Sequence, residues 1–406
     1  MLTPRPYQIE GRDFLAGRKC ALLADEMRVG KTPQAILAAH KRGATSIRVG
    51  CPAIAVPHWH REVEKWWPSG PLPRLEVMSY NKLTELWTQG IKGTADVFIP
   101  DEAHFAKNPD ALRTRAVYSN TGFCRYAGAT WPLSGTPAPK HAGELWPMMR
   151  AFGATKMDYQ WFVGKYCTIN KFTQKITGTK EKMIPELRAL LATFMLRRTR
   201  KEVAPEMPDI DFQFLEVEPN GQADIQVPAG LSDEQLAEWL ESNQCADASD
   251  RVAVAHAKVL PLAKHIDFAI QNDLLQQTVV FGWHTEPLEH LTRLLNDCGI
   301  SAELITGKTG PRSRERIQDN LQKGLTDVIC GNIMAMGTAI DLSSARHGFA
   351  LELDWVPGNN VQAVNRLVSM EKEDKVTVDV VTWPGSTDDR VQQVLMRRVR
   401  ELNQLY

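Results

Sequence analysis

The stretch DEMRVGKT, residues 25–32, lies between an apolar run at 20–24 and an amphipathic segment at 33–39. A strand, a loop that ends in Gly-Lys-Thr and a helix together bind nucleotide phosphates, because backbone N–H groups at the helix N-terminus face the anion. Lys31 adds a positive charge, and the hydroxyl of Thr32 is suited to hold Mg²⁺. The stretch therefore predicts a phosphate-binding loop that follows a buried strand.

A second motif follows at the end of another apolar strand. Residues 97–104 read VFIPDEAH, so this strand delivers two adjacent carboxylates, Asp101 and Glu102, to its carboxyl end. ATP hydrolysis requires a carboxylate for the metal and another for the attacking water. In this order, the two motifs predict a nucleotide-driven motor.

The composition restricts the class of protein. The chain has 406 residues, 43% of them hydrophobic and 24% charged, which is typical of a soluble globular protein with two domains of roughly 200 residues each. No apolar run approaches the ~20 residues of a membrane span, and the first residues lack the layout of a signal peptide. Seven cysteines are scattered singly, which favours reduced thiols. We therefore expect a cytoplasmic protein.

The charge balance gives no global attraction to nucleic acid. Lys and Arg together number 48, as do Asp and Glu, so the formal charge is zero. Any contact with DNA must then come from local basic clusters. The candidates are 197–201 and 312–316, whereas 397–400 is interpreted as a solvated face.

Short apolar strands alternate with amphipathic segments in two parts of the chain. This alternation predicts the α/β class, with parallel sheets that carry helices on both faces. The predicted strands are 21–23, 47–50, 75–78, 96–99 and 125–133 in the first part, and 278–281, 302–305, 327–330, 348–353 and 376–381 in the second. A closing helix is predicted over 388–405.

The middle of the chain has a different character. Residues 151–210 read as helical, mixed in charge and without clear strands, and residues 212–250 carry turn signals typical of an inter-domain connection with a short helix inside. The predicted division is therefore 1–155 for a first lobe, 156–250 for a helical insertion and connection, and 251–406 for a second lobe.

Nine segments match, in order, the motifs of a single protein family. They are LTPRPYQ (2–8), DEMRVGKT (25–32), VGCP (49–52) with Trp59, Glu62 and Trp66, SYN (79–81), DEAHFAKNP (101–109), LSGTP (133–137), MLRRTRKEV (195–203), Gly307 with Arg316 and AMGTAIDL (335–342), and DW (354–355) before QAVNR (362–366). A single short motif is weak, but nine in one order are highly specific. The chain resembles the Swi/Snf-like ATPases of helicase superfamily 2, with a DEAH-box second motif, along nearly its whole length.

This resemblance implies two tandem RecA-like lobes with a small helical segment between them, and ATP with Mg²⁺ bound between the lobes. It also implies roles for individual residues. The catalytic residues are Lys31, Asp101, Glu102 and Arg366; the nucleotide contacts are Gln8, Gly30, Lys31 and Thr32; the metal ligands are Thr32 and Asp101; and the residues that couple hydrolysis to movement are Ser134, Thr136 and Gln362.

The function that the resemblance implies is a DNA-dependent ATPase that translocates on duplex or branched DNA. Phosphate contacts suit such movement because they carry no sequence information. We expect a monomer, with replication or recombination proteins as candidate partners. The brevity of the chain favours a compact bacterial or viral type, acting in the cytoplasm of a bacterium or of a virus-infected host cell.

Three positions depart from the family pattern. Arg28 replaces a usual glycine, which raises the question whether this position needs a positive φ, and Ala339 replaces the second glycine of the fifth motif. Ser369 occupies the place of the usual arginine finger, a group worth roughly 10³–10⁵ in rate. Hydrolysis should therefore be crippled unless Arg366 or Lys372 substitutes.

This last departure supports an alternative hypothesis. In it the chain is a degenerate motor, which acts mainly as a module that binds DNA or a replication protein. The intact Lys31, Asp101 and Glu102 argue against complete loss of hydrolysis, so weak ATPase activity is the central expectation.

Several other residues allow two interpretations. His58 and His60 have a spacing compatible with a metal, but an amphipathic position without ligation is favoured. Trp59 and the pair at 66–67 could stack on bases, but core packing is favoured. His104 is compatible with packing between the lobes. Residues 307–309, GKT, mimic a phosphate loop without its spaced glycine and are interpreted as a decoy.

Overall fold

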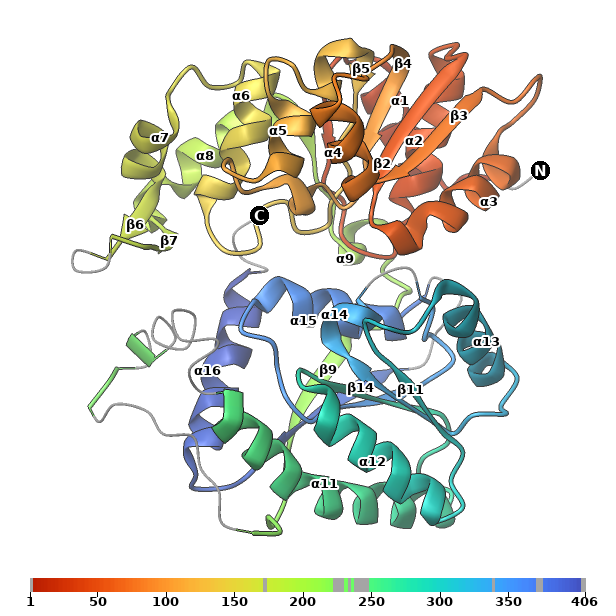
Figure 1. The fold of residues 1–406 in the computed structure, drawn as a ribbon, viewed down its shortest axis with the longest axis vertical. Coiled ribbons are helices and arrows are strands. Elements are labelled where there is room, and N and C mark those ends of the chain that lie inside the picture. Colours follow the sequence, from red (N-terminus) through yellow and green to blue (C-terminus); the bar gives the residue numbers. More distant parts are fainter. Residues whose placement is uncertain are drawn as a thin grey trace. The chain divides into compact units, whose positions relative to one another are not determined.

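The computed structural model describes residues 3–170, 174–221, 230–232, 235–236, 248–337, 340–369 and 375–402. The chain divides into two compact units, Met1–Ala204 and Pro205–Leu405, drawn red to yellow-green and green to blue in Figure 1. In each unit helices cover a parallel sheet, which confirms the two predicted RecA-like α/β lobes. The predicted boundaries at 155 and 250 differ from this division, because it assigns 156–204 to unit 1.

The sheet of unit 1 has the strand order β3-β2-β4-β5, and all its pairings are parallel. Its strands are β2 (Ser46–Cys51), β3 (Arg74–Ser79), β4 (Ala95–Pro100) and β5 (Ala127–Thr130). Isolated bridges, Cys20 to Thr130 and Leu23 to Leu133, join β1 (Leu22–Leu23) to the β5 side. The loop after β1 and the carboxylates after β4 therefore emerge at the same carboxyl edge of parallel strands.

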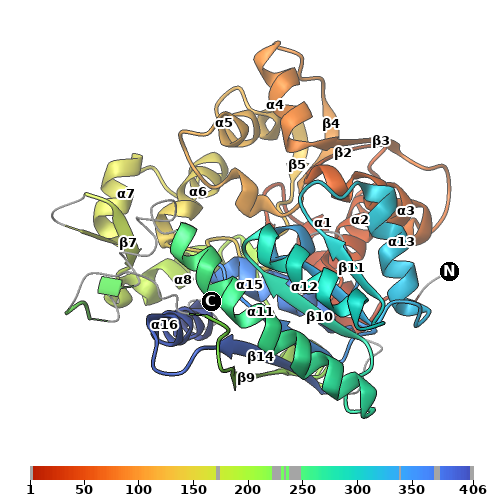
Figure 2. The ribbon, with the colours of Figure 1, turned by 60° about the horizontal axis from the view of Figure 1, so that its bottom comes forward.

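Two helical layers cover this sheet. Helices α1 (Pro6–Ala16), α2 (Lys31–Lys41) and α3 (Val56–Trp66) pack in sequence on one another, as do α4 (Tyr80–Thr88), α5 (Leu112–Tyr118) and α6 (Trp146–Phe152). Figure 2 shows the two groups on opposite sides of β2, β4 and β5. This arrangement confirms the prediction of helices on both faces.

The remaining part of unit 1 contains short elements of both kinds. They are α7 (Tyr159–Tyr166), β6 (Cys167–Ile169), β7 (Ile176–Thr179), α8 (Ile184–Ala192), β8 (Met195–Leu196) and α9 (Arg200–Val203). The prediction that 151–210 lacks strands is wrong, since β6 and β7 form an antiparallel pair and β8 pairs with β1. Strands of two to four residues are too short to show a period in the sequence.

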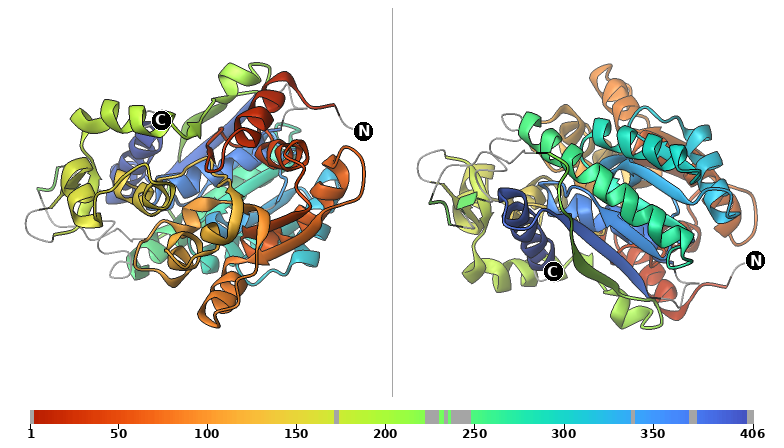
Figure 3. Two further views of the ribbon diagram at one scale, coloured as in Figure 1. Left: turned by 90° about the horizontal axis from the view of Figure 1, so that it is seen from above. Right: turned by 90° about the horizontal axis from the view of Figure 1, so that it is seen from below.

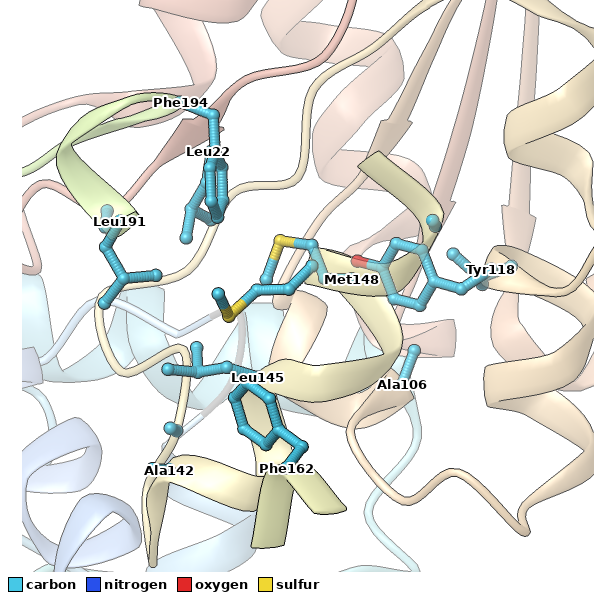
Figure 4. Close-up of a cluster of buried hydrophobic side chains, with 14 of the residues drawn as sticks. Leu22, Ala106, Tyr118, Ala142, Leu145, Met148, Phe162, Leu191 and Phe194 are labelled. Atoms are coloured by element: carbon cyan, nitrogen blue, oxygen red, sulfur yellow. The ribbon is translucent and has the colours of Figure 1, made fainter. Parts of the chain in front are cut away.

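The core explains why this part belongs to unit 1. Phe162, Leu191 and Phe194 are buried in one apolar cluster with Leu22 of β1 (Figure 4). Side chains of α7 and α8 thus share a core with β1, the strand that precedes the phosphate loop, rather than forming a separate connection.

The sheet of unit 2 has six parallel strands in the order β11-β12-β10-β13-β14-β9. They are β9 (Ile210–Glu216), β10 (Thr278–Gly282), β11 (Ala302–Ile305), β12 (Val328–Asn332), β13 (His347–Ala350) and β14 (Val376–Thr382). The prediction that residues from 212 onward form a connection is wrong for β9, which pairs along its length with β14. The helix predicted within 212–250 lies largely outside the described residues.

The helices of unit 2 are α11 (Ala248–Gln271), α12 (Thr285–Asp297), α13 (Pro311–Gln322), α14 (Ile333–Met336), α15 (Pro357–Val364) and α16 (Thr387–Leu402). Helices α11 and α12 pack on each other across one face of the sheet, as the right view of Figure 3 shows in green and teal. Helix α16 confirms the predicted closing helix. Short 3₁₀ turns lie at η1 (Ala53–Ala55), η2 (Ala103–Ala106), η3 (Phe123–Tyr126), η4 (Ala142–Leu145), η5 (Glu181–Met183) and η6 (Asn365–Leu367).

Within the described part of the chain, no helix is both long and apolar enough to cross a membrane. The same residues contain no group of three or more His, Cys, Asp or Glu side chains that could hold a metal ion. The six described cysteines are free thiols, and Cys245 lies outside the described residues.

Candidate active site

The phosphate loop connects β1 to α2 in a conformation that favours glycine. Helix α2 begins at Lys31, and its N-cap Gly30 has φ +76°. Arg28, two residues earlier, has φ +70°. Position 28 therefore adopts the positive φ that a glycine would favour, although it carries an arginine. A side chain in this left-handed region costs roughly 1–2 kcal/mol.

Lys31 folds back over its own loop. Its ammonium donates to the backbone oxygens of Asp25 at 2.8 Å and Glu26 at 3.1 Å. Burial lowers the pKa of Lys31, and the charges of Glu102, Asp25 and Asp101 oppose this shift. The predicted phosphate ligand is therefore a desolvated cation in the field of both carboxylates of the second motif.

The first turn of α1 lies against this loop. The buried Gln8 accepts a hydrogen bond from the backbone N–H of Arg5 at 2.9 Å through its side-chain oxygen. Its amide nitrogen is so close to Gly30 that a Cβ there would come within 2.5 Å. Thr32 is half-buried at the second residue of α2. The four residues predicted to contact the nucleotide thus lie in one region of unit 1.

Asp101 is held by two donors. The indole N–H of Trp59 donates to one carboxylate oxygen at 2.8 Å, and the backbone N–H of Glu102 donates to the other at 3.0 Å. Burial and the charge of Glu102 raise the pKa of Asp101 to about 6, although Trp59 and Lys31 act to lower it. A cation bound at this carboxylate would therefore oppose both effects that raise its pKa.

The surroundings of Asp101 resolve the interpretation of Trp59. The indole is completely buried, which confirms core packing rather than stacking on bases. The hydroxyl of Tyr80 donates to the backbone oxygen of Asp101 at 2.8 Å and fixes the strand end. His58 and His60, on the same helix as Trp59, are exposed.

The third motif lies against the second. His104 Nδ1 is 3.1 Å from the hydroxyl of Ser134 and 3.5 Å from the carboxylate of Glu102. Burial lowers the pKa of His104 to about 3, so the ring is neutral at pH 7. The backbone N–H of Thr136 donates to Ser134 Oγ at 3.3 Å. The two coupling residues predicted in unit 1 are thus connected to the second motif through His104.

Sequence reasoning missed the partner of the buried Asp25. In the cluster at 197–201, a candidate for DNA contact, two arginines instead contact the phosphate loop and a third contacts residues beside it. Arg198 donates to both carboxylate oxygens of Asp25, at 3.1 and 2.6 Å; Arg197 donates to the Ala24 and Gly135 carbonyls; and Arg200 contacts the Glu26 carboxylate. A carboxylate at a buried strand end requires a cation, and this is the signal that could have revealed the pairing.

The two remaining predicted residues belong to unit 2. Arg366 donates twice to the carbonyl of Gly337, at 3.1 and 2.7 Å. The buried Gln362 of α15 also lies beside Gly337, with its Cγ 3.6 Å from the position of an added Cβ. Ser369 is half-exposed after η6. Ala339 and Lys372 lie outside the described residues.

Comparison with known proteins adds independent information. The SNF2-related domain matches residues 7–100 and 75–224, which is more than half of the chain, and the helicase conserved C-terminal domain matches 259–371. The helicase domain of Hef from Pyrococcus furiosus shares the fold, with a TM-score of 0.52 and 14% identity over 96% of this chain and 97% of that one.

Two curated relatives cover almost the whole chain. The SWI/SNF-related matrix-associated actin-dependent regulator of chromatin subfamily A-like protein 1 of Xenopus tropicalis is 25% identical over an alignment of 427 positions, which covers 98% of this chain and 44% of that protein. The DNA annealing helicase and endonuclease ZRANB3 of Homo sapiens is 25% identical over an alignment of 442 positions, which covers 97% of this chain and 40% of that protein. The chain thus spans less than half the length of these two relatives. Both are animal proteins, and the bacterial or viral type stays a prediction. The chain belongs to the SNF2-related family of helicase superfamily 2 ATPases.

Proposed function

We propose that the chain is a DNA-dependent ATPase that translocates on duplex or branched DNA. The observation that carries this proposal is the position of the Lys31 ammonium, which lies 2.8 and 3.1 Å from two carbonyl oxygens of its own loop and in the field of Asp101 and Glu102. This arrangement concentrates, at one sheet edge, the cation that an anionic phosphate needs and the carboxylates that hydrolysis needs.

The donor set fits Mg²⁺. A hydroxyl from Thr32 and a carboxylate from Asp101 are the hard oxygen ligands that this ion prefers. Burial and the charge of Glu102 raise the pKa of Asp101, and a bound cation would oppose both effects. Bound Mg²⁺ would supply charge neutralisation at the phosphates. Thr32 and Asp101 are therefore the residues that would hold it.

The other residues of unit 1 have roles that follow from their position. Lys31 would exchange its two backbone carbonyls for phosphate oxygens, and Gln8 would contact the adenine. Glu102, next in the chain to Asp101, would orient the attacking water and take its proton. Ser134, in contact with His104, and Thr136, whose backbone N–H donates to Ser134, would transmit the state of the nucleotide to the rest of the motor.

In unit 2, Gln362 and Arg366 are proposed to act on the same nucleotide, with Arg366 as the cation at the transferring phosphate. In the structure its guanidinium donates to Gly337. Catalysis through Arg366 therefore requires it to exchange this carbonyl for phosphate.

DNA is proposed as the track because of the relatives. One of them is named a DNA annealing helicase and endonuclease, which supports DNA as the substrate of this chain. Contacts mainly to phosphates would allow movement without sequence preference. We further propose that the protein is a monomer in the cytoplasm, with partners from replication or recombination.

The chain contains its own control for the nucleotide site. Residues 30–32 and 307–309 both read Gly-Lys-Thr, but Lys308 is exposed and precedes α13, which begins only at Pro311. Lys31→Ala should abolish ATP hydrolysis, while Lys308→Ala should leave it unchanged. Retained hydrolysis in Lys31→Ala would overturn the assignment of the site.

The degenerate motor remains a second candidate. Ser369 in place of an arginine, together with the engagement of Arg366 by Gly337, favours weak hydrolysis. In that case the chain would act chiefly through binding of DNA or of a replication protein.

A further inference from the structure

Arg198 makes an unusual number of contacts around the phosphate loop. Its guanidinium grips Asp25 with two nitrogens, at 3.1 and 2.6 Å. The Asp25 carboxylate is completely buried, and the Arg198 side chain is only 11% exposed. Such bidentate, charge-assisted pairs fix geometry as well as charge, and lysine cannot replace them.

Arg198 is also connected to the N-cap of α2 through the side chain of Gln34. Arg198 donates to the Gln34 side-chain oxygen at 2.9 Å. The amide nitrogen of Gln34 then donates to Asp25 at 3.1 Å and to the carbonyl of Gly30 at 3.1 Å. Both ends of the Gln34 amide are thus engaged, and Gly30 is the N-cap of the helix that presents Lys31 and Thr32.

The same guanidinium also holds α1. It donates to the backbone oxygen of Tyr7 at 2.6 Å and to the Glu10 carboxylate at 3.2 Å. Gly11 of α1 is so close that an added Cβ would lie 3.0 Å from the guanidinium and 1.7 Å from the Gln34 oxygen. Gln8, the residue proposed to contact the adenine, lies against Gly30 of the phosphate loop. Arg198 therefore holds both the helix that carries Gln8 and the phosphate loop.

Backbone pairing extends this connection toward the end of unit 1. The N–H of Ala24 donates to Leu196 at 2.7 Å, and the N–H of Glu26 donates to the carbonyl of Arg198 at 2.9 Å. The segment that carries Arg198 therefore runs beside the loop and leaves unit 1 at Ala204.

We propose that Arg198 is a positioning residue for nucleotide binding, which holds the phosphate loop and the first turn of α1 in their mutual register through Asp25 and Gln34. This inference rests on the proposed ATPase function. Loss of the two-nitrogen contact leaves the buried Asp25 without its full set of donors, so the loop must move to satisfy or hydrate it. A small displacement of binding groups is enough to lower catalysis strongly.

The test is the variant Arg198→Lys in the full chain. The lysine keeps the charge but loses the two-nitrogen geometry, so we expect KM for ATP to rise about tenfold or more, corresponding to about 1.4 kcal/mol per factor of ten, with a smaller fall in kcat. The matched control is Arg42→Lys. Arg42 also connects α2 to α1, by donating to the Ala16 carbonyl at 3.0 Å, but at the exposed end away from the loop. It should leave KM and kcat unchanged.

A second variant approaches the pair from the other side. Asp25→Asn should raise KM in the same way, and the double variant with Arg198→Lys should add little to either single change, since contacting residues are not additive. All assays are made well below the melting temperature of each variant, and that temperature is measured beside them.

The outcomes separate the two proposals. If Arg198→Lys has a lower melting temperature but the KM and kcat of the parent, Arg198 only stabilises the fold, and the inference is overturned. Full additivity of the two variants would also overturn it. If the parent itself hydrolyses no more ATP than Lys31→Ala, the proposed function fails first; in that case the affinity of the Arg198→Lys variant for a fluorescent ATP analogue still tests the positioning role.

Discussion

The indole N–H of Trp59 donates to a carboxylate oxygen of Asp101 at 2.8 Å. Trp59 is completely buried on α3, so a helix remote in sequence orients the first carboxylate of the second motif. The hydrogen bond also opposes the burial that raises the pKa of Asp101. A tryptophan of the apparent core therefore contributes directly to the geometry of the proposed metal ligand.

Trp59→Phe should preserve much of the packing but remove this donor. We expect a higher Mg²⁺ concentration for half-maximal ATP hydrolysis, with kcat/KM lower by about tenfold, because a charge-assisted hydrogen bond contributes roughly 1.5–3 kcal/mol. A titration of activity with MgCl₂ measures this. Trp87→Phe, which removes an exposed indole bond to Thr121, is the control. An unchanged Mg²⁺ dependence in Trp59→Phe would show that Trp59 only fills space.

The buried His104 should make stability depend on pH. Its folded-state pKa is lowered to about 3 by burial, whereas the unfolded chain has a pKa of about 6.5. Between these values the unfolded state binds the proton, so the free energy of unfolding falls as the pH decreases below 6.5. At pH 5 the loss relative to neutral pH is about 2 kcal/mol.

Urea unfolding at pH 7.5 and pH 5 measures this loss. His104→Gln removes the titrating group, so its free energy of unfolding should depend less on pH, by about the same 2 kcal/mol. Equal pH dependence in the parent and the variant would mean that His104 can accept its proton in the folded protein.

Unit 2 contains a buried ion pair that stabilises the junction of α11 and α16. Lys258 and Asp388 are 2.8 Å apart, with side chains 1% and 4% exposed, and Lys258 also donates to the carbonyl of Val381 at 3.0 Å. Lys258→Met should lower the free energy of unfolding by about 3–5 kcal/mol, because it leaves a buried charge without a partner.

A second change tests that explanation of the loss. The double variant with Asp388→Asn removes the uncompensated charge and should recover part of the stability, as measured by urea unfolding of the parent and both variants. A loss in the single variant below about 1 kcal/mol, the range of surface ion pairs, would contradict the role of the pair.

Arg28 bears backbone strain that a glycine would relieve. Its φ of +70° lies in the left-handed region, so Arg28→Gly should raise the free energy of unfolding by about 1 kcal/mol or leave it unchanged, since the flexible unfolded chain offsets part of the gain. Arg28→Val should be destabilising, because a branched Cβ suits this region worst. The reverse order of the two variants in thermal unfolding would show that the arginine side chain, rather than the backbone, determines stability here.

Ser369→Arg tests the cause of weak hydrolysis. If the absent arginine limits the rate, the variant should increase kcat toward the roughly 10³-fold effect of such groups, and kcat for ATP measures this. Ser343→Arg, a change at a loop serine of the same unit that is half-buried like Ser369, is the control. No increase would show either that Arg366 already serves this role or that another step limits the rate.

Much of the fold could be predicted because its strands are buried and apolar. The predicted strands at 47–50, 96–99 and 278–281 agree with β2, β4 and β10 within one or two residues. Strand β9 is a half-exposed edge strand, and the alternation of apolar and polar residues in its sequence, IDFQFLE, is a strand signal that the turn signals directly after it obscure. Its pairing with β14 is a tertiary contact that no local pattern reveals.

The candidate site shows the same limit. The loop at 25–32 and the pair at 101–102 could be found because each motif is continuous in sequence. The residues that orient these motifs, Trp59 and Arg198, are distant from them in the chain. In the sequence, Trp59 resembles an ordinary core residue, and Arg198 resembles part of a basic surface cluster. At the decoy, residues 307–309, the backbone is instead held by a nearby arginine. Arg314 donates to the carbonyls of Thr306 and Thr309.

The most direct test of the proposed motor is ATP hydrolysis measured without DNA and with single-stranded, duplex and forked DNA, for the parent, Lys31→Ala and Lys308→Ala. We expect duplex or forked DNA to stimulate hydrolysis in the parent and in Lys308→Ala, and Lys31→Ala to show none. A parent that hydrolyses ATP no faster than Lys31→Ala on every DNA would contradict the motor and leave a binding module in its place.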